Sequence, residues 1–128
     1  MSKLVFLFPG QGSQQIGMAS QLYSNWGWFR QQLDEWFALA NDFQLAPLHE
    51  VMLGLNGQGP RLVETQYTQP ILYALEVGLA RLWQRWGIQP DTVMGHSLGE
   101  IPAAVLAGVI SDQEGMEMAL VRGRLMQN

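Results

Sequence analysis

The chain has 128 residues, a length typical of one domain with its own hydrophobic core. Its formal net charge of −4 argues against a nucleic-acid-binding or polybasic membrane-binding surface, and the absence of cysteine excludes disulfides and cysteine-ligated metal sites. No stretch is apolar enough to span a membrane and no charged-then-apolar leader precedes the first strand, so we expect a soluble, cytoplasmic protein. Charged residues make up only 14% of the chain, against about 25% in a typical domain, which predicts more apolar surface than the chain covers alone.

The first predicted element is a strand. Residues 4–8 are continuously apolar, which is typical of a strand buried on both faces. Pro9 ends it, and the glycine-rich loop of residues 10–14 leads to a short predicted helix over residues 16–23. The glycines do not have the G-x-G-x-x-G spacing of a dinucleotide fingerprint, which disfavours that function. The loop is then either a tight strand-to-helix turn or a nest of amides that faces an anion.

The next segment is helical and aromatic. Residues 25–40 carry apolar side chains at helical spacing, which predicts a packing face made of Trp26, Phe29, Leu33, Trp36, Phe37 and Ala40. A loop over residues 41–46 follows, and Pro47 can open a short helix that ends at Leu53. His49 lies in that helix without companions for a metal site, so we interpret it as structural or solvated. Residues 54–60 are turn-rich and form the expected mobile loop.

The clearest predicted helix follows this loop. Thr68 is its expected N-cap, Pro70 falls near its first turn, and Gly87 ends it. Its predicted buried stripe consists of Leu72, Leu75, Leu79, Leu82 and Trp83.

A second strand and a sharp turn organise the rest of the chain. Residues 92–94 form a β-prone run, residues 95–99 read Gly-His-Ser-Leu-Gly, and residues 101–109 are apolar and helical in character. This is the G-x-S-x-G nucleophile elbow between a strand and a helix, which makes Ser97 the candidate nucleophile. The amides and dipole at the start of the following helix can stabilise an oxyanion beside that serine.

Two neighbours of the elbow have structural interpretations. Residues 97–100 match a capping box, so we favour Glu100 as an acid at the start of the helix over a catalytic role. Pro102 removes an early hydrogen bond from a helix that begins at Leu98, so we expect a distorted first turn.

The last helix opens at a second capping box over residues 111–114 and runs to the end of the chain. A helical wheel gathers the apolar side chains of Met118, Val121, Leu125 and Met126 on one side. Arg122 falls among them, while Arg124 falls on the opposite, polar side and is expected to be solvated. Because an unpaired buried guanidinium is costly, Arg122 needs an anion, which is either Glu100 or a substrate carboxylate.

Four motifs give the chain a resemblance to a known family. They are residues 8–14 (Phe-Pro-Gly-Gln-Gly-Ser-Gln), 66–70 (Gln-Tyr-Thr-Gln-Pro), 95–100 (Gly-His-Ser-Leu-Gly-Glu) and 121–127 (Val-Arg-Gly-Arg-Leu-Met-Gln). In this order they resemble the malonyl-CoA:acyl-carrier-protein transacylase family, which includes the acyltransferase domains of fatty acid and polyketide synthases. The resemblance implies an α/β fold in which residues 1–128 form the N-terminal part of an α/β-hydrolase-like core with parallel strands. We expect the ferredoxin-like subdomain of the family to be missing from these residues.

The resemblance also implies a ping-pong reaction. Ser97 takes a malonyl-type acyl group from coenzyme A and passes it to the phosphopantetheine thiol of an acyl carrier protein. The backbone amides of Gln11 and Leu98 match the oxyanion hole. Coenzyme A then enters only as a thioester substrate, with no tightly bound cofactor and no metal.

Further residues match the family's substrate pocket. Arg122 matches the arginine that grips the malonyl carboxylate, which favours the substrate over Glu100 as its partner. His96 and Gln69 match residues that line the pocket, and we assign Gly10 to it with them. His96 adjoins the nucleophile and is not the base.

The chain departs from the family at the general base that the serine requires. The family supplies this base as a histidine far beyond the serine, whereas this chain ends 31 residues after Ser97 and has only His49 and His96. We therefore expect the N-terminal portion of an acyltransferase that works with a C-terminal remainder. The alternatives are a non-catalytic association segment or an acyl hydrolase that edits carrier proteins. A hydrolase does not need a carboxylate clamp, so Arg122 argues against it.

Overall fold

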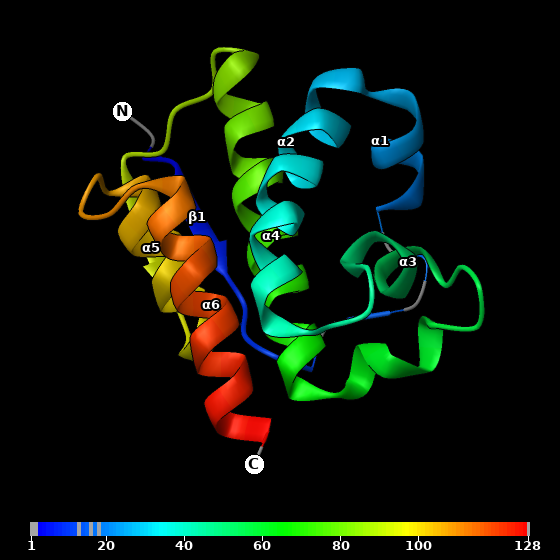
Figure 1. Ribbon diagram of the computed structural model, residues 1–128. Coiled ribbons are helices and arrows are strands. Elements are labelled where there is room, and N and C mark those ends of the chain that lie inside the picture. The colour runs from blue at the N-terminus through cyan, green and yellow to red at the C-terminus, as the bar shows by residue number, and fades with distance from the viewer. Residues whose placement is uncertain (1–2, 13, 16, 18, 128) are drawn as a thin grey trace.

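The computed structural model describes residues 3–12, 14–15, 17 and 19–127. Over these residues the fold is helix-rich with one small parallel sheet (Figure 1). The strands and α-helices are β1 (Val5–Phe8), α1 (Ser20–Asn25), α2 (Gly27–Ala38), α3 (Leu48–Leu53), α4 (Thr65–Arg85), β2 (Thr92–Gly95), α5 (Glu100–Leu106) and α6 (Asp112–Gln127). Short 3-10 helices cover Leu39–Phe43, Gly59–Val63 and Ser97–Gly99.

The sheet joins two segments that lie far apart in the sequence. β1 and β2 pair in parallel, with Val5 opposite Thr92 and Phe8 opposite Gly95. Both strands are therefore confirmed. The expected burial of β1 on both faces is wrong for the described chain, because the side chain of Leu7 is 69% exposed and only Phe8 is buried.

Helix α4 runs through the middle of the fold, with α5 and α6 on one side of it and α2 on the other (Figure 1). α6 packs closely on α4 because two of its glycines leave room. A Cβ atom on Gly115 would lie 2.3 Å from the Tyr73 hydroxyl, and one on Gly123 would lie 3.1 Å from the Thr65 carbonyl oxygen. The close contact between α4 and α6 at these glycines decides which face of α6 is buried.

The predicted apolar face of α6 is wrong as a buried face. Its four members are all exposed: Met118, Val121, Leu125 and Met126. The buried face lies on another side of the helix and consists of Gly115, Met116, Ala119, Leu120 and Gly123. Small residues allow the backbones of α4 and α6 to approach each other closely. This close packing determines which face is buried, although the side chains on the other face are larger.

The start of α4 also differs from the prediction. Thr68 is not its N-cap, because the helix begins at Thr65 with Glu64 as the capping position. Thr68 is buried inside the helix, where its hydroxyl donates to the carbonyl oxygens of Leu62 and Glu64. Pro70 consequently lies within the helix, and Gly87 follows its end with a φ of 87°, as expected for a helix stop.

The buried stripe of α4 is confirmed only in part. Leu72 and Leu82 are buried, whereas Leu79 and Trp83 are exposed and Leu75 is half-buried. The side chains that fill the core from this helix are mainly Tyr67, Ile71, Tyr73, Ala74 and Val77.

The aromatic packing face predicted over residues 25–40 is confirmed except at Trp26. Phe29, Leu33, Trp36, Phe37 and Ala40 are all buried, while Trp26 is exposed beside the tryptophans at the end of α4. α3 follows Pro47 as expected. The predicted helix over residues 16–23 begins at Ser20, and the part of that prediction that falls on Ile16 lies outside the described residues.

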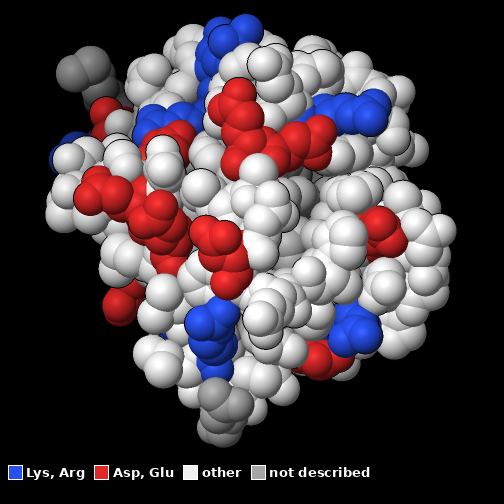
Figure 2. All heavy atoms as spheres, in the orientation of Figure 1, with Lys and Arg blue, Asp and Glu red and all other residues white. Residues whose placement is uncertain are grey.

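The molecular surface is sparsely charged. On the face drawn in Figure 2 the acidic side chains gather mainly over the left and the centre, basic side chains are scattered around them, and wide areas carry neither. Among the described helices, none has the length and hydropathy needed to cross a bilayer.

Candidate active site

Ser97 occupies a strained turn between β2 and α5. Its φ is 58°, in the left-handed region that side chains with a Cβ rarely adopt. The cost is on the order of 1–3 kcal/mol and persists only where the surrounding structure enforces it. Ser97 begins the 3-10 turn Ser97–Gly99, and α5 follows at once. The strand, turn and helix reproduce the geometry of a nucleophile elbow.

The glycines of the elbow are required by close backbone contacts. A Cβ atom on Gly95 would lie 1.9 Å from the Gly99 carbonyl oxygen, and one on Gly99 would lie 1.9 Å from the Phe8 carbonyl oxygen. No side chain fits at either position. The first contact folds the turn tightly, and the second presses it against the end of β1.

The loop after β1 lies directly against the serine. A Cβ atom on Gly10 would lie 2.9 Å from the His96 carbonyl oxygen and 3.7 Å from the Ser97 hydroxyl oxygen. The backbone N–H of His96 donates to the Phe8 carbonyl oxygen at 3.1 Å, which extends the strand pairing into the elbow. The structure therefore brings Gly10 next to Ser97.

Gln11 is anchored by a residue that the sequence did not single out. Its side-chain Nε2 donates to the Thr65 hydroxyl at 3.1 Å, which ties the loop to the first residue of α4. Thr65 was missed because the predicted start of that helix was placed at Thr68. Leu98, the other predicted oxyanion donor, is fully buried beneath the elbow.

Arg122 connects the serine to α4. Its Nη2 donates to the Ser97 hydroxyl oxygen at 3.4 Å, and its Nη1 donates to the Gln69 Oε1 at 2.8 Å. Gln69 is only 1% exposed, and its Nε2 donates to the Met126 sulfur at 3.3 Å. A buried amide that bonds on both sides fixes the orientation of the guanidinium.

Glu100 is not the partner of Arg122. The ion pairs found between described residues are Arg30–Asp34 and Arg81–Asp112. Glu100 lies instead in the first turn of α5, as expected for an acid at a helix start. The partners of Arg122 within the described chain are neutral, so its charge stays available for an anion.

The two predicted capping boxes have different outcomes. The one at Ser97 is wrong, because α5 begins at Glu100 with Gly99 as its capping position and has no side-chain cap. Pro102 lies in the first turn of α5, and the expected distortion is present as the 3-10 turn Ser97–Gly99 that leads into this helix. The box at Ser111 is confirmed by reciprocal bonds, in which the Ser111 N–H donates to Glu114 Oε1 at 2.9 Å and the Glu114 N–H donates to the Ser111 hydroxyl at 3.0 Å. The hydrogen bond from the Ser111 backbone N–H lowers the pKa of the Glu114 carboxyl, and the Ser111 side chain adds to the shift.

The described chain brings no general base to Ser97. Arg122 is the side chain that bonds the serine hydroxyl, and a guanidinium cannot accept a proton. Arg124 is exposed, as expected, and its guanidinium also lies 4.3 Å from the centre of the Phe43 ring. Clusters of His, Asp and Glu that could hold a metal are absent from the described residues.

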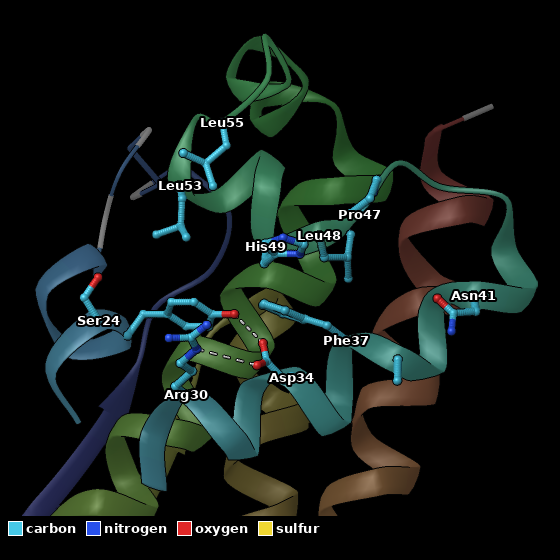
Figure 3. Close-up of a pocket in the computed structure, with 12 residues that line it drawn as sticks. Ser24, Arg30, Asp34, Phe37, Asn41, Pro47, Leu48, His49, Leu53 and Leu55 are labelled. Carbon is cyan, nitrogen blue, oxygen red and sulfur yellow. Dashed lines mark hydrogen bonds and ion pairs between the residues drawn. The ribbon is translucent and has the colours of Figure 1, made fainter. Parts of the chain in front are cut away.

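His49 lies in a different hollow, which contains none of the predicted site residues. This pocket of about 670 Å³ lies between α1, α2 and α3 (Figure 3). Within it the Tyr23 hydroxyl donates to Asp34, and Arg30 lies 3.9 Å from the same carboxylate. Burial raises the pKa of Tyr23 to about 12, with the Asp34 hydrogen bond adding to the shift.

Comparisons with known proteins match the chain along nearly its whole length. The family model described as acyl transferase domain matches residues 5–128. A phenolphthiocerol synthesis polyketide synthase type I of Mycobacterium marinum is 44% identical over 130 residues, which cover 99% of this chain and 6% of that synthase. The acyl transferase domain of ZmaA superposes with a TM-score of 0.88 at 36% identity, covering 98% of this chain and 30% of that domain. A malonyl-transacylase in complex with its type II polyketide synthase acyl-carrier protein superposes with a TM-score of 0.79 at 37% identity. This match covers 98% of this chain and 39% of that chain.

Proposed function

Since this chain belongs to the acyl transferase domain family, we propose that it supplies the nucleophile, oxyanion hole and carboxylate clamp of a malonyl-type acyltransferase. Residues 1–128 form the N-terminal segment of its α/β-hydrolase-like large subdomain. The ferredoxin-like subdomain and the general base belong to a C-terminal remainder. The acyl group moves from a coenzyme A thioester to Ser97, and from there to an acyl carrier protein.

One observation carries this proposal: a strained serine, a close-packed glycine loop and an oriented arginine converge at one point. Ser97 has a φ of 58°, the Gly10 backbone abuts it, and the Arg122 guanidinium reaches its hydroxyl at 3.4 Å. The three come from segments that are far apart in sequence. A packing role for each residue separately does not account for their convergence on one hydroxyl.

The reaction balances as two acyl transfers. The Ser97 hydroxyl oxygen attacks the thioester carbonyl, its proton passes to the base, and the C–S bond breaks as coenzyme A leaves as a thiol. The thiol of the carrier protein's phosphopantetheine then attacks the acyl-serine ester, and the serine regains a proton. Each tetrahedral intermediate places a negative charge on the carbonyl oxygen, which the amides of Gln11 and Leu98 stabilise.

The carboxylate clamp gives the site its substrate preference. Arg122 holds a malonyl carboxylate with its planar pair of N–H groups, and Gln69 holds the guanidinium in place from behind. His96 and Gly10 line the same pocket. Coenzyme A takes part as a substrate thioester, and the reaction needs no tightly bound cofactor.

The carrier-protein partner is proposed from a structural relative. The malonyl-transacylase that superposes on this chain was solved in complex with an acyl-carrier protein. A shared fold at 37% identity supports the same class of partner here. The alternative is an association segment without catalysis, which the missing base among the described residues favours. A carrier-editing hydrolase is disfavoured because it has no use for the Arg122 clamp.

The test uses the chain joined to the part of the ZmaA acyl transferase domain that has no counterpart here; we call this protein the assembled domain. Radiolabelled malonyl-CoA is added, and peptide mass spectrometry locates the label. We expect malonyl on Ser97, and transfer of that label to a phosphopantetheinylated carrier protein. A folded assembled domain that takes up no label at Ser97 would support the association segment.

A further inference from the structure

The proposed oxyanion donor Gln11 lies between two glycines of the loop after β1. Gly10 precedes it, and Gly12 follows it with a φ of 121°, a conformation that residues with a side chain rarely adopt. Because glycine has more backbone freedom than any other residue, ordering such a peptide is costly. A backbone amide that stabilises an oxyanion must nevertheless be in place before the reaction begins. A contact that ties this peptide to a rigid element therefore bears directly on the reaction.

Thr65 supplies such a contact from the first residue of α4. Its half-buried hydroxyl accepts a hydrogen bond from Gln11 Nε2 at 3.1 Å. Two contacts with α6 hold this end of α4 in turn. The Thr65 carbonyl oxygen lies against Gly123, where an added Cβ would be only 3.1 Å away, and the Gln66 N–H donates to Gln127 Oε1 at 3.2 Å. The hydroxyl that holds Gln11 is therefore itself carried by packed helices.

The same side of α4 also holds the proposed carboxylate clamp. Gln69 follows Thr65 by four residues, so the two side chains leave the helix on one face, about one turn apart. Gln69 accepts a hydrogen bond from Arg122 at 2.8 Å, as Thr65 does from Gln11. The Arg122 guanidinium in turn reaches the Ser97 hydroxyl at 3.4 Å. One turn of α4 thus contacts both the loop and the arginine that meet at the nucleophile.

We propose that Thr65 is a positioning residue, whose hydroxyl holds the Gln11 side chain and thereby keeps the Gln11 backbone N–H aimed at the oxyanion. Thr65 itself touches no reacting atom and acts only through Gln11. The proposal rests on the proposed function for the role of that N–H. It predicts a loss of rate that does not depend on the acyl group, because every thioester forms the same oxyanion. A defect in the clamp would instead weaken malonyl transfer selectively.

The first experiment compares two variants of the assembled domain. Thr65→Val removes the hydroxyl and keeps the branched shape, whereas Thr65→Ser keeps the hydroxyl. Rapid-quench kinetics give the rate at which Ser97 is acylated by saturating malonyl-CoA and by saturating acetyl-CoA. We expect Thr65→Val to lower both rates by the same factor of about 10 to 100, which is less than the loss of a whole oxyanion donor. The half-saturating concentration of acyl-CoA should stay nearly unchanged, and Thr65→Ser should restore most of the rate.

The exposed Thr92 at the start of β2 provides the control for the substitution itself, and Thr92→Val should acylate at the parent's rate. A selective loss with malonyl-CoA would assign Thr65 to the clamp and overturn the proposal. So would a Thr65→Ser variant that is as slow as Thr65→Val.

A double-mutant cycle tests whether Thr65 acts through Gln11. Gln11→Ala removes the side-chain amide and keeps the backbone N–H that the reaction needs. It should slow acylation about as much as Thr65→Val does. The double variant should be no slower than either single variant, because each change breaks the same hydrogen bond. Losses that multiply in the double variant would show that Thr65 acts by another route.

The last experiment does not depend on acyl transfer. The assembled domain is labelled with nitrogen-15 at glutamine, and NMR relaxation gives the order parameter of the Gln11 backbone amide. We expect about 0.85 in the parent and in Thr65→Ser, and a value below about 0.6 in Thr65→Val. An amide that is equally ordered in all three proteins would refute the positioning role. A parent domain that takes up no label at Ser97 would refute the proposed function instead, so the two failures are distinguishable.

Discussion

The Arg122 guanidinium donates to the Ser97 hydroxyl across 3.4 Å, while its other terminal nitrogen holds Gln69 at 2.8 Å. The first bond is long and the second is short. A substrate carboxylate can therefore replace the serine contact without disturbing the bond that orients the guanidinium. This difference is compatible with the proposed role of Arg122 as a carboxylate clamp beside Ser97.

Replacing Arg122 should separate two substrates. In the assembled domain, Arg122→Ala should reduce kcat/KM for malonyl-CoA by far more than for acetyl-CoA, because only malonyl carries a carboxylate. The selective loss should be on the order of 2–5 kcal/mol, as when one partner of a buried charge pair is removed. Steady-state transfer to a carrier protein measures both. Equal losses for the two substrates would make Arg122 a structural residue.

Replacing Ser97 should abolish the covalent intermediate. Ser97→Ala leaves no oxygen to accept the acyl group, so labelled malonyl-CoA should leave no label on the denatured protein. Alanine also adopts the positive φ of this turn with difficulty, so circular dichroism must first establish that the variant is folded. Label that survives on a folded variant would place the nucleophile elsewhere.

The elbow glycines permit a sharp stability test on the chain alone. Gly99→Ala should destabilise it by more than about 3 kcal/mol, because the new Cβ would lie 1.9 Å from the Phe8 carbonyl oxygen. Gly27→Ala is the matched control, since a Cβ there meets no atom within 4 Å and the position starts helix α2. We expect Gly27→Ala to be neutral or stabilising. Urea unfolding measures both, and similar midpoints would contradict the contact.

Glu76 should make the stability of the 128-residue chain depend on pH. Burial of this carboxyl raises its pKa in the folded state, so the folded chain holds a proton between pH 4.5 and about 8 that the unfolded chain releases. The free energy of unfolding should therefore fall as pH rises through this window, by at most about 5 kcal/mol.

Glu76→Gln supplies the comparison for this pH dependence. It removes the ionisable proton, so the decline from this residue should disappear. Urea unfolding at intervals between pH 5 and 9 measures the two curves. A variant whose stability falls as steeply as the parent's would show that another group is responsible.

Local chemistry made much of the site predictable. The alternation of apolar runs with glycine-rich turns identified both strands, and the G-x-S-x-G pattern placed Ser97 at the turn between β2 and α5. The wheel of the last helix indicated that Arg122 needed a partner. The wheel did not identify Gln69 as that partner, because the contact between Arg122 and Gln69 depends on how α6 lies across α4.

The failures share a physical origin in tertiary packing. Large apolar residues on α6 and α4, such as Leu125 and Leu79, were expected inside and are exposed. The buried face of α6 instead includes glycine and alanine, because these small residues let the helices approach each other. The start of α4 at Thr65 was not predicted, because Thr65 has no strong capping pattern. The Thr65–Gln11 hydrogen bond was therefore missed as well.

The close packing of α4 against α6 bears on the substrate preference proposed for Arg122. Gly123 adjoins Arg122 in sequence and faces the backbone at Thr65 and Gln66. One added methyl group there would lie 3.1 Å from the Thr65 carbonyl oxygen, so α4 or α6 would have to shift by a few tenths of an ångström. A shift of α6 would move the Arg122 guanidinium, although the new atom touches no reactant. Discrimination between acyl groups would then be adjustable from a position that has no side chain at all.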